Sequence, residues 1–571
     1  MKCSVFDWLV VLVNPEQRSV DVIVNDKDSL HKYYDANKRD IWVGYNSNYY
    51  DQYILKGILC GFDPKRVNDF IIEKGKFGWQ FSSMFKEIPL ISYDCMIGNH
   101  SLKQLEGFLG NKIKESSVPF DIDRKLTDEE IAETIEYCKH DVFNTMQVFE
   151  ETIAQFKTKL FFIKHYNYPL TYLSKTMAQL SCTILGGNGK YLRENYNDEF
   201  DYPVLDCLDI NKYKDVVEWF KNKTHYGENY VCMVAGIPHT FGAGGIHGND
   251  GVIKNGENDA IPVYLSGIFV MIDVTAYYPS MQEENHWGYR VMDNPQEFEF
   301  IHGSNIEFKR KGDKEARQPF KIMDNAISGQ LKQKTSKLYD PMSNNAITAN
   351  GQLMLLDLIE HIEGFCQIVQ SNTDGILVKL DRMDDFDLLD DAVYEWECRT
   401  GMKMDFDTYI GHIYQKDCNN YLLIDYESGK IKRKGCIKKL SVLDNNLPII
   451  NKACVDYLAY DIPMEQTINE CNELKQFQMI CRISKLYKCL IHGDDVLNER
   501  CVRVFASKNK RDGGLYQLHR NKTKPDKYPS TPIHCFIDNE DVNGVPVPNN
   551  LDREWYIDMA KKIVKGFGKD V

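Results

Sequence analysis

The sequence has many cysteines but lacks the pattern by which cysteines commonly bind zinc. None of the 17 cysteines stands in a Cys-x-x-Cys pair, and the closest two are Cys481 and Cys489. A zinc finger is therefore not expected, and reduced, buried thiols in a cytoplasm are the simpler interpretation.

Long apolar runs and targeting signals are also missing. No apolar run reaches the about 18 residues that a membrane-spanning helix needs, and no basic segment followed by an apolar one opens the chain. Internal repeats and low-complexity tracts are absent as well. These absences predict a protein that stays in the cytoplasm and has no membrane partner.

Basic residues are in the minority, with 69 Lys and Arg against 83 Asp and Glu and a net charge of -14. That balance argues against a nucleic-acid partner, but the basic residues are concentrated. Residues 430–439 contain six and no acidic residue, and residues 500–528 contain nine against two acidic ones. Contacts to phosphate are local, because charges are screened beyond roughly 8–10 Å. Basic segments of this kind are typical of surfaces that bind nucleic-acid phosphates. The alternative is a basic face exposed to solvent.

The length of 571 residues predicts about three or four domains. Strands are expected at 6–13, 20–24 and 41–44, followed by a helix at 128–149, which together indicate an α/β domain with a mixed or parallel sheet. Thr127 and Glu130 have the spacing of a capping box at the start of that helix. Further helices are expected over residues 150–185, about 313–337 and about 345–363.

Two aspartates interrupt apolar, β-branched segments. Asp273 follows residues 268–272, and Asp374 comes 101 residues later, just before residues 376–378. Both segments predict buried strands. Two strands that each present an Asp can hold a pair of divalent cations, which at roughly 3.5–4 Å clamp the attacking and leaving oxygens of a phosphoryl displacement. The pair therefore indicates nucleotidyl transfer.

Between the two aspartates lies a predicted helix that carries Lys321, Asn325 and Gly329. The spacing of four places Lys321 and Asn325 on one helical face. A lysine there suits a triphosphate, and a glycine lets a base or backbone approach closely. Taken alone, such a face is commonplace.

Together the three segments resemble the motifs of the family B DNA polymerases, specifically the compact phage-type members. Residues 273–280 match Asp-x-x-x-x-Tyr-Pro-Ser, and residues 321–329 match Lys-x-x-x-Asn-x-x-x-Gly. Residues 372–374 match Asp-Thr-Asp with the first Asp changed to Asn, and in that family the second Asp is the metal ligand. Residues 337–341, 351–353 and 503–507 are similar too, so the resemblance covers nearly the whole chain.

The resemblance implies an α/β multidomain protein, with an RNase H-like exonuclease domain followed by a right-hand polymerase of palm, fingers and thumb. The expected divisions are 1–155 for an exonuclease-like domain with a truncated first strand, 156–262 for a connecting region and the start of the palm, 263–300 for the palm with the first Asp motif, 301–363 for the fingers, 364–428 for the palm with the second Asp motif, and 429–571 for the thumb and C-terminal region.

The resemblance also implies roles at the nucleotide site. Two Mg²⁺ ions, or Mn²⁺ as a substitute, would be held by Asp273, Asp374 and the carbonyl of Val274, because Mg²⁺ prefers hard oxygen donors. The remaining expected contacts to the dNTP come from the backbone of Thr275 and Tyr277, a sugar-contacting Tyr278, a charge-offsetting Lys321, and Asn325, Gly329 and Arg317, with Arg310 and Lys314 as further basic candidates. For Tyr278 the alternative is a buried core tyrosine.

Contacts to DNA are implied downstream and upstream of these motifs. Lys416, Tyr421, Lys432 and Lys434 lie in segments that resemble those holding the primer strand, and such phosphate contacts position DNA without reading its sequence. Gly244 and Gly245, within the glycine-rich residues 242–248, resemble the loop that joins the exonuclease and polymerase parts. A flexible hinge is the alternative there.

The first 150 residues resemble the 3′→5′ exonuclease domain of the family. Residues 46–51 match Asn-x-x-x-aromatic-Asp and residues 137–141 match Tyr-x-x-x-Asp. Residues 101–105 and 118–121 are also typical of the phage group. By resemblance, Asp51 and Asp141 would bind metal, Tyr137 would orient water, and Asn46 would belong to the same site.

The opening Asp-x-Glu motif of that domain is absent, and Asp7 cannot replace it because Leu9, not Glu, follows two residues later. We therefore expect severely reduced exonuclease activity, through either a truncated start or a real loss of proofreading.

The sequence thus predicts a DNA-directed DNA polymerase that acts on primer–template DNA and dNTPs. Only 48 residues separate Asp273 from Lys321, which favours an ordinary nucleic-acid primer over protein priming. By resemblance the protein is a phage protein, a monomer with replisome partners, in the cytoplasm of a bacterial host. The rival hypotheses are a 3′→5′ exonuclease or repair nuclease, and a catalytically inactive DNA-binding replication protein.

Overall fold

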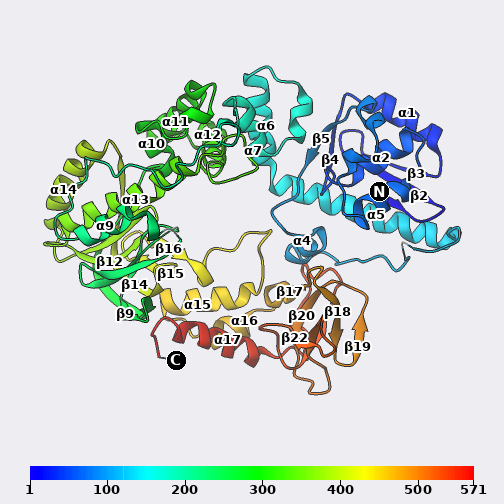
Figure 1. The fold of residues 1–571 in the computed structure, drawn as a ribbon. Coiled ribbons are helices and arrows are strands. Elements are labelled where there is room, and N and C mark those ends of the chain that lie inside the picture. The colour runs from blue at the N-terminus through cyan, green and yellow to red at the C-terminus, as the bar shows by residue number, and fades with distance from the viewer. Residues whose placement is uncertain (120, 226, 243, 571) are drawn as a thin grey trace. The chain divides into compact units, whose positions relative to one another are not determined.

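The computed structural model describes residues 1–119, 121–225, 227–242 and 244–570, which form a mixed α/β structure (Figure 1). The chain divides into two compact units. The first contains Met1–Thr176, Leu440–Ile449 and Ile468–Tyr556, and the second contains Met177–Lys439, Ile450–Thr467 and Ile557–Val571. The range 429–571, expected as thumb and C-terminal region, therefore contributes to both units, and the expected domain boundaries stay predictions.

None of the helices in the described ranges is at once long enough and apolar enough to cross a lipid bilayer.

The N-terminal part of the first unit contains two small sheets rather than one. Strands β1 (Lys2–Cys3), β2 (Trp8–Asn14) and β3 (Ser19–Val24) pair antiparallel, whereas β4 (Ile41–Gly44) and β5 (Ile91–Asp94) pair parallel. The three predicted strands are thus present to within two residues, and among the described residues parallel pairing occurs between β4 and β5.

The helices that accompany these strands are α1 (Lys27–Asn37), α2 (Asp51–Leu59), α3 (Pro64–Ile72), α4 (Leu102–Leu109), α5 (Asp128–Glu151) and α6 (Ile153–His165). The predicted capping box at the start of α5 is confirmed. Thr127 Oγ1 accepts from the Glu130 N–H at 3.3 Å, and Glu130 Oε2 accepts from the Thr127 N–H at 2.9 Å. Two otherwise unpaired N–H groups at the helix start are thereby satisfied.

The C-terminal part of the first unit is mostly β. One sheet contains β17 (Met479–Arg482), β20 (Cys501–Ala506) and β23 (Cys535–Ile537), and another contains β18 (Tyr487–His492), β19 (Asp495–Leu497), β21 (Leu515–His519) and β22 (Asp526–Lys527). Arg503 of β20 is fully buried and donates to the carbonyls of Gly107, Asn111, Asp538 and Glu540. Its guanidinium therefore joins α4 to this β region, and burial lowers its pKa to about 10.

The second unit is built on a nine-stranded sheet in the order β16-β15-β14-β11-β13-β12-β8-β7-β6. Its strands are β6 (Tyr230–Val234), β7 (Ile237–Phe241), β8 (His247–Asn249), β11 (Val263–Val274), β12 (Gln367–Asn372), β13 (Gly375–Leu380), β14 (Met404–Asp417), β15 (Asn420–Asp425) and β16 (Ile431–Lys434), with β9 (Gly251–Lys254) and β10 (Glu257–Ala260) as a separate hairpin.

Val270 and Ile272 are fully buried on one face of β11, and Phe269 and Met271 are buried on the other. The strands predicted beside Asp273 and Asp374 are confirmed.

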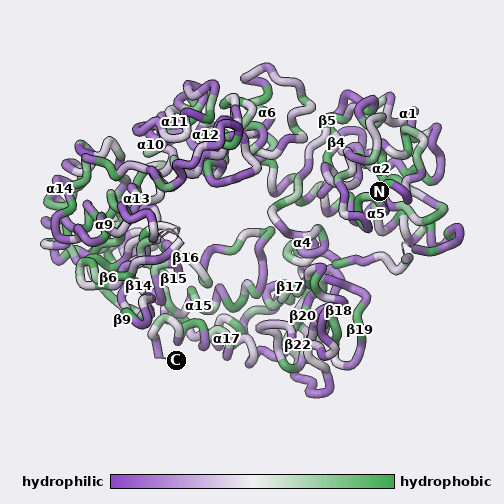
Figure 2. Tube along the Cα trace, viewed as in Figure 1, coloured by the Kyte–Doolittle hydropathy of each residue, from purple (hydrophilic) through white to green (hydrophobic). Residues whose placement is uncertain are grey.

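The helices of the second unit are α7 (Met177–Ile184), α8 (Lys190–Arg193), α9 (Lys214–Lys221), α10 (Tyr277–Glu284), α11 (Pro295–Arg310), α12 (Lys314–Ser328), α13 (Pro341–Ile362) and α14 (Asp385–Thr400). Three more have residues in both units: α15 (Pro448–Tyr460), α16 (Met464–Glu470) and α17 (Arg553–Lys565). Helices α11 and α12 form a hairpin, and their traces include long hydrophilic stretches (Figure 2). The helix expected over residues 313–337 is shorter, because α12 ends at Ser328.

Candidate polymerase active site

The two aspartates that lie 101 residues apart in the sequence are neighbours in the structure. Asp273 is at the end of β11 and pairs with Gly375, the first residue of β13. The Val274 N–H donates to the carbonyl of Asp374 at 2.8 Å. Asp374 is exposed and Asp273 is half-buried, so both carboxylates lie where β11 and the turn before β13 meet.

Two lysines of β16 lie near this strand end, one beside Asp273 and one beside Asn372. Lys432 Nζ lies 3.2 Å from Oδ2 of Asp273, and Lys434 Nζ lies 3.4 Å from Oδ1 of Asn372. Burial raises the pKa of Asp273, Lys432 opposes that rise, and the negative charge of Asp374 adds to it. The site therefore concentrates negative charge that favours a cation, and one lysine ammonium partly compensates it.

Residue 375 must be glycine because it lies close to the Asp273 carboxylate, which the sequence did not reveal. A Cβ atom at this position would lie 2.3 Å from Oδ1 of Asp273. Real Cβ atoms do not approach so closely, so any larger residue would displace the carboxylate.

The turn after Asp273 directs the backbone from strand to helix. The Thr275 N–H donates to the carbonyl of Lys403 at 2.7 Å, so it is engaged within the protein. Ala276 then adopts φ +46°, unusual for a non-glycine residue, and α10 begins at Tyr277. Of the predicted phosphate-binding N–H groups, those at the start of α10 fit best, since they have no acceptor within their own helix.

The adjacent tyrosines have different environments. Tyr277 is buried, and its hydroxyl donates to the carbonyl of Gly351 at 2.7 Å, which fixes α10 to α13. Tyr278 is half-buried, and burial together with the charge of Asp374 raises its pKa to about 12. Tyr278 is therefore partly accessible, and its role as a sugar-contacting residue stays a prediction, whereas Tyr277 has the environment of a core tyrosine.

The predicted basic face of α12 is exposed. Lys321, Asn325 and Gly329 are exposed at intervals of four residues, and Arg317 lies one turn earlier, half-buried. Arg317 Nε donates to Oδ1 of Asn305 on α11 at 2.9 Å. Arg310 and Lys314, the other basic candidates, are also exposed.

The glycine-rich loop is held against the turn that carries Asp374. Thr373 Oγ1 donates to the carbonyl of Gly244 at 3.5 Å. A Cβ on Gly245, whose φ is +112°, would lie 2.9 Å from Thr373 Oγ1, so this position needs glycine for both space and conformation. Ala243, within the same predicted loop, lies outside the described residues, as does Phe120 of the motif at 118–121.

Two further aspartates extend the acidic site and were not predicted. Asp405 on β14 pairs in register with Asp273, and its carboxylate accepts from Thr275 Oγ1 and from Lys309 Nζ. Asp407, two residues on, accepts from Lys430 at 2.9 Å. The sequence signal was the Asp-x-Asp alternation of a strand, which places both on one face.

The remaining predicted DNA contacts differ in exposure. Lys416 and Lys434 are exposed and Lys432 is half-buried. Tyr421 is only 3% exposed, and its burial, with Asp273 nearby, raises its pKa. Tyr421 therefore lies below the acidic surface rather than on it.

In the first unit, the exonuclease-like carboxylates are paired with ammonium groups. Lys103 Nζ lies 2.5 Å from Oδ1 of Asp141, and the α-amino group of Met1 lies 3.1 Å from Oδ1 of Asp51. Lys2 Nζ lies 3.7 Å from the ring centroid of Tyr137, and burial lowers the Lys2 pKa to about 8. The structure thus brings three of the predicted residues into one cluster with these cations.

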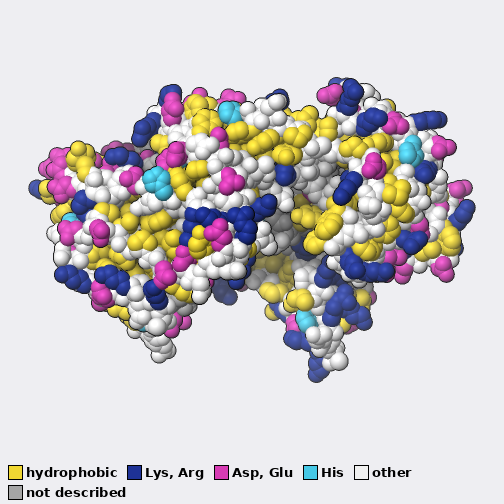
Figure 3. Space-filling model, turned by 45° about the horizontal axis from the view of Figure 1, so that its top comes forward, with side chains coloured by type: hydrophobic (Ala, Val, Ile, Leu, Met, Phe, Trp, Pro, Cys, Tyr) yellow, Lys and Arg dark blue, Asp and Glu magenta, His cyan; other side chains and the backbone are white. Residues whose placement is uncertain are grey.

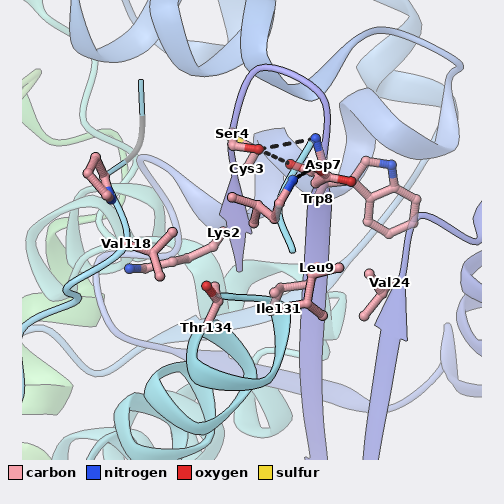
Figure 4. A pocket seen from close by; sticks show the side chains of 12 residues that line it. Lys2, Cys3, Ser4, Asp7, Trp8, Leu9, Val24, Val118, Ile131 and Thr134 are labelled. Carbon is pink, nitrogen blue, oxygen red and sulfur yellow. Dashed lines mark hydrogen bonds between the residues drawn. The ribbon is translucent and has the colours of Figure 1, made fainter. Parts of the chain in front are cut away.

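The other acidic and polar residues of this region have structural roles. Asp7 accepts from the Leu126 N–H at 2.8 Å and from Nδ2 of Asn25 at 2.7 Å. Asn46 has φ +58°, and its N–H donates to Asp94 at 2.8 Å. Figure 4 shows the Lys2 ammonium on the Val118 side of a small pocket, away from Asp7. Asp7 is thus committed to the fold of this region.

The two acidic sites differ in how well they suit a divalent cation. Within the described ranges, no group of three or more His, Cys, Asp and Glu side chains is arranged to hold a metal ion. Asp273, Asp374 and the Val274 carbonyl are hard oxygen donors that fit Mg²⁺ when substrate phosphates and water complete its shell. The cluster at Asp51 and Asp141 fits less well, because the Lys103 ammonium already pairs with Asp141.

Charge is unevenly distributed over the surface. On the face that Figure 3 shows, Lys and Arg side chains gather in clusters between acidic ones. The net charge of -14 therefore coexists with local basic surface of the kind that contacts phosphates.

Comparison with known proteins gives one structural neighbour of interest. No protein-family model matches the chain, and no curated protein matches it. Among solved structures, it is similar to the family B DNA polymerase from the hyperthermophilic archaeon Pyrobaculum calidifontis, with 13% identity and a TM-score of 0.42, over 98% of this chain and 74% of the archaeal chain. The neighbour is a DNA polymerase, and these comparisons assign the chain itself to no family.

Proposed function

We propose that this protein is a DNA-directed DNA polymerase of the compact, phage-type family B class, which adds dNTPs to the 3′ end of a primer. The observation that carries the proposal is the meeting of Asp273 and Asp374 at adjacent strand ends, where β11 pairs with β13. Lys321 and Asn325, exposed on α12 in the same unit, supply a positive charge and a neutral hydrogen-bonding group suited to a triphosphate.

Asp273, Asp374 and the Val274 carbonyl would hold two Mg²⁺ ions, or Mn²⁺ in their place. When bound, such a pair favours the primer hydroxyl as nucleophile and neutralises the charge of the triphosphate. The protein's own part is to hold the carboxylates together. Lys432 opposes the rise that burial causes in the pKa of Asp273, and the small Gly375 leaves room for its carboxylate.

The side chains around the carboxylates would bind and orient the dNTP. Lys321, a flexible point charge, would offset the negative charge of the departing pyrophosphate. Tyr278 would lie under the deoxyribose and exclude a 2′-hydroxyl by its bulk. The N–H groups at the start of α10 would donate to phosphate oxygens, as helix N-termini do.

The primer–template would be held by contacts to its backbone. Lys432 lies beside Asp273 and Lys434 beside Asn372, where the primer end would be placed, and Lys416 is exposed on β14. Gly244 and Gly245 would allow DNA to approach the loop next to Asp374. All these contacts would be independent of sequence.

We further propose that the exonuclease-like region has severely impaired proofreading. Lys2 and Lys103 provide positive charge where two divalent cations would be needed, and Asp7 is used elsewhere. This pattern also counts against the rival nuclease hypothesis.

The biological setting is phage DNA replication by a monomer with replisome partners, in the cytoplasm of a bacterial host. The rival hypothesis of an inactive DNA-binding protein is disfavoured, because binding alone needs no paired carboxylates.

Primer extension on a templated substrate tests the proposal. Wild-type protein should extend the primer, Asp374→Ala should abolish extension, and Asp390→Ala, at an exposed aspartate of α14, should leave it unchanged. Absence of extension by the wild-type protein would refute the proposed function.

A further inference from the structure

A buried imidazole lies between α12 and α10, behind the face that carries Lys321. His302 of α11 contacts Oδ2 of Asp324 through Nδ1 at 2.9 Å, and Oγ of Ser280 through Nε2 at 3.2 Å. Asn305, one turn along α11, donates to the same Asp324 oxygen at 2.8 Å. Three helices are thus connected through one ring and one carboxylate.

The connections continue at both ends. On the α12 side, Asn305 accepts from Nε of Arg317 at 2.9 Å. On the α10 side, Ser280 Oγ donates to the carbonyl of Thr275 at 3.0 Å, two residues after Asp273. A continuous chain of polar contacts therefore runs from a basic residue of α12 to the turn that follows the first catalytic aspartate.

The polar contacts through His302 are buried, unlike those of an ordinary surface network. His302 is 2% exposed, Asp324 is 1% exposed and Asn305 is 3% exposed. Burying such groups costs free energy unless they bond one another, and apolar side chains would pack a helix hairpin without that cost. The polar chain therefore needs a reason beyond packing.

The positions of the two residues that His302 joins give that reason. Asp324 directly precedes Asn325, and Ser280 lies two residues after Tyr278. We propose that His302 is a positioning residue which, by bonding Asp324 and Ser280 together, fixes the dNTP-binding face of α12 relative to Tyr278. This inference rests on the proposed polymerase function and adds a residue that none of its motifs contains.

The two contacts of His302 specify the protonation state of its ring that bonds Asp324 and Ser280 at the same time. A carboxylate only accepts, so Nδ1–H of His302 donates to Asp324. The Ser280 hydroxyl already donates to Thr275, so its oxygen accepts from Nε2–H. Both ring nitrogens then carry hydrogen, and the ring is positively charged when it bridges the two helices.

The surroundings favour that charge. Burial lowers the pKa of His302, but the hydrogen bond and charge of Asp324, together with Glu283, outweigh burial, so the pKa is raised. Glu283 Oε2 lies 3.6 Å from Nε2, and both line a cavity of about 140 Å³ with Glu284 and Lys403. Because the pKa is raised, the bridge is complete at low pH and is lost as pH rises through the raised pKa.

The test is steady-state primer extension at several pH values, with wild type, His302→Ala, His302→Gln and Ser280→Ala. Loss of the bridge should raise the dNTP KM by about 3–10-fold, the effect of one net hydrogen bond. The wild-type KM should rise with pH, while the His302→Ala KM should be high and independent of pH. His302→Gln, which keeps a donor toward Ser280, should restore part of the affinity.

Ser328→Ala is the matched control. Ser328 donates to the backbone carbonyl of Asp324 but takes no part in the chain of polar contacts through His302. Ser280→Ala keeps the His302–Asp324 pair, so it provides the test if His302→Ala fails to fold. If the wild type extends primers but Ser280→Ala and His302→Gln keep its KM and pH profile, the positioning role is overturned and the polymerase function stands. If the wild type does not extend primers, the proposed function itself fails.

Discussion

The ammonium of Lys432 lies 3.2 Å from Oδ2 of Asp273, so β16 supplies a cation to the strand end that carries this aspartate. A lysine in this place is well situated to contact the phosphate of an incoming primer end. Lys432→Met should weaken primer–template binding and lower the slope of log affinity against log salt by about one. Binding titrations at several salt concentrations measure this. Lys254→Met, at an exposed lysine of the β9–β10 hairpin, should leave the slope unchanged.

Gly375 should be indispensable for catalysis. In Gly375→Ala the new methyl group would lie within 2.3 Å of the Asp273 carboxylate and would displace it. We expect extension to fall by about 100-fold or more, since small misplacements of reacting groups cost about that much. Gly364→Ala is the control, because nothing lies within 4 Å of a Cβ there. Equal rates for both variants would contradict the close approach.

The exonuclease-like region should not remove nucleotides at a useful rate. A 3′ mismatched primer incubated with Mg²⁺ and no dNTPs should stay intact, because Lys103 and Lys2 occupy the surroundings of Asp141 and Tyr137. Rapid, Mg²⁺-dependent loss of the mismatched nucleotide would show that this region is catalytically competent.

Lys103 should instead contribute to stability. Its ammonium pairs with the fully buried Glu106 at 2.9 Å as well as with Asp141. Lys103→Met would leave the buried Glu106 carboxylate without its lysine partner, with only the His140 imidazole 3.6 Å away, and should lower the free energy of unfolding by about 3–5 kcal/mol. Urea denaturation measures the change. Lys139→Met, which removes an exposed pair with Glu136, should change it by less than about 1 kcal/mol.

Arg503 offers a test of the β region that joins α4. Replacement by lysine keeps the charge but cannot reach the four carbonyls that the guanidinium bonds, and each buried group left unpaired costs about 1–3 kcal/mol. Arg503→Lys should therefore lower the thermal midpoint clearly. Arg500→Lys is the matched control, since its guanidinium also bonds carbonyls but is more exposed. Equal midpoints for the two variants would contradict the role given to Arg503.

Local patterns in the sequence predicted much of the secondary structure. The strands beside Asp273 and Asp374, the helical face of Lys321 and Asn325, and the capping box of Thr127 each depend on neighbouring residues. Such features are decided by hydrophobic periodicity and capping, which one sequence displays.

The features that the sequence did not reveal depend on pairing between distant strands. Asp405 joins the site because β14 pairs in register with β11, and Gly375 matters because its Cα faces the Asp273 carboxylate. The antiparallel pairing of β1–β3 and the contact of Lys432 with Asp273 likewise depend on tertiary structure. No local pattern specifies which strands become neighbours.

The central claim is that Asp273 and Asp374 form a nucleotidyl-transfer site, and single-nucleotide incorporation tests it most directly. A primer–template with one unpaired template base is mixed with Mg²⁺ and each dNTP in turn, for wild type, Asp273→Asn, Asp374→Asn and Asp390→Asn. We predict that wild type and Asp390→Asn extend the primer by the one complementary nucleotide, and that the other two variants bind DNA but add nothing. Incorporation that persists in Asp374→Asn, or that is absent from the wild type, would contradict the claim.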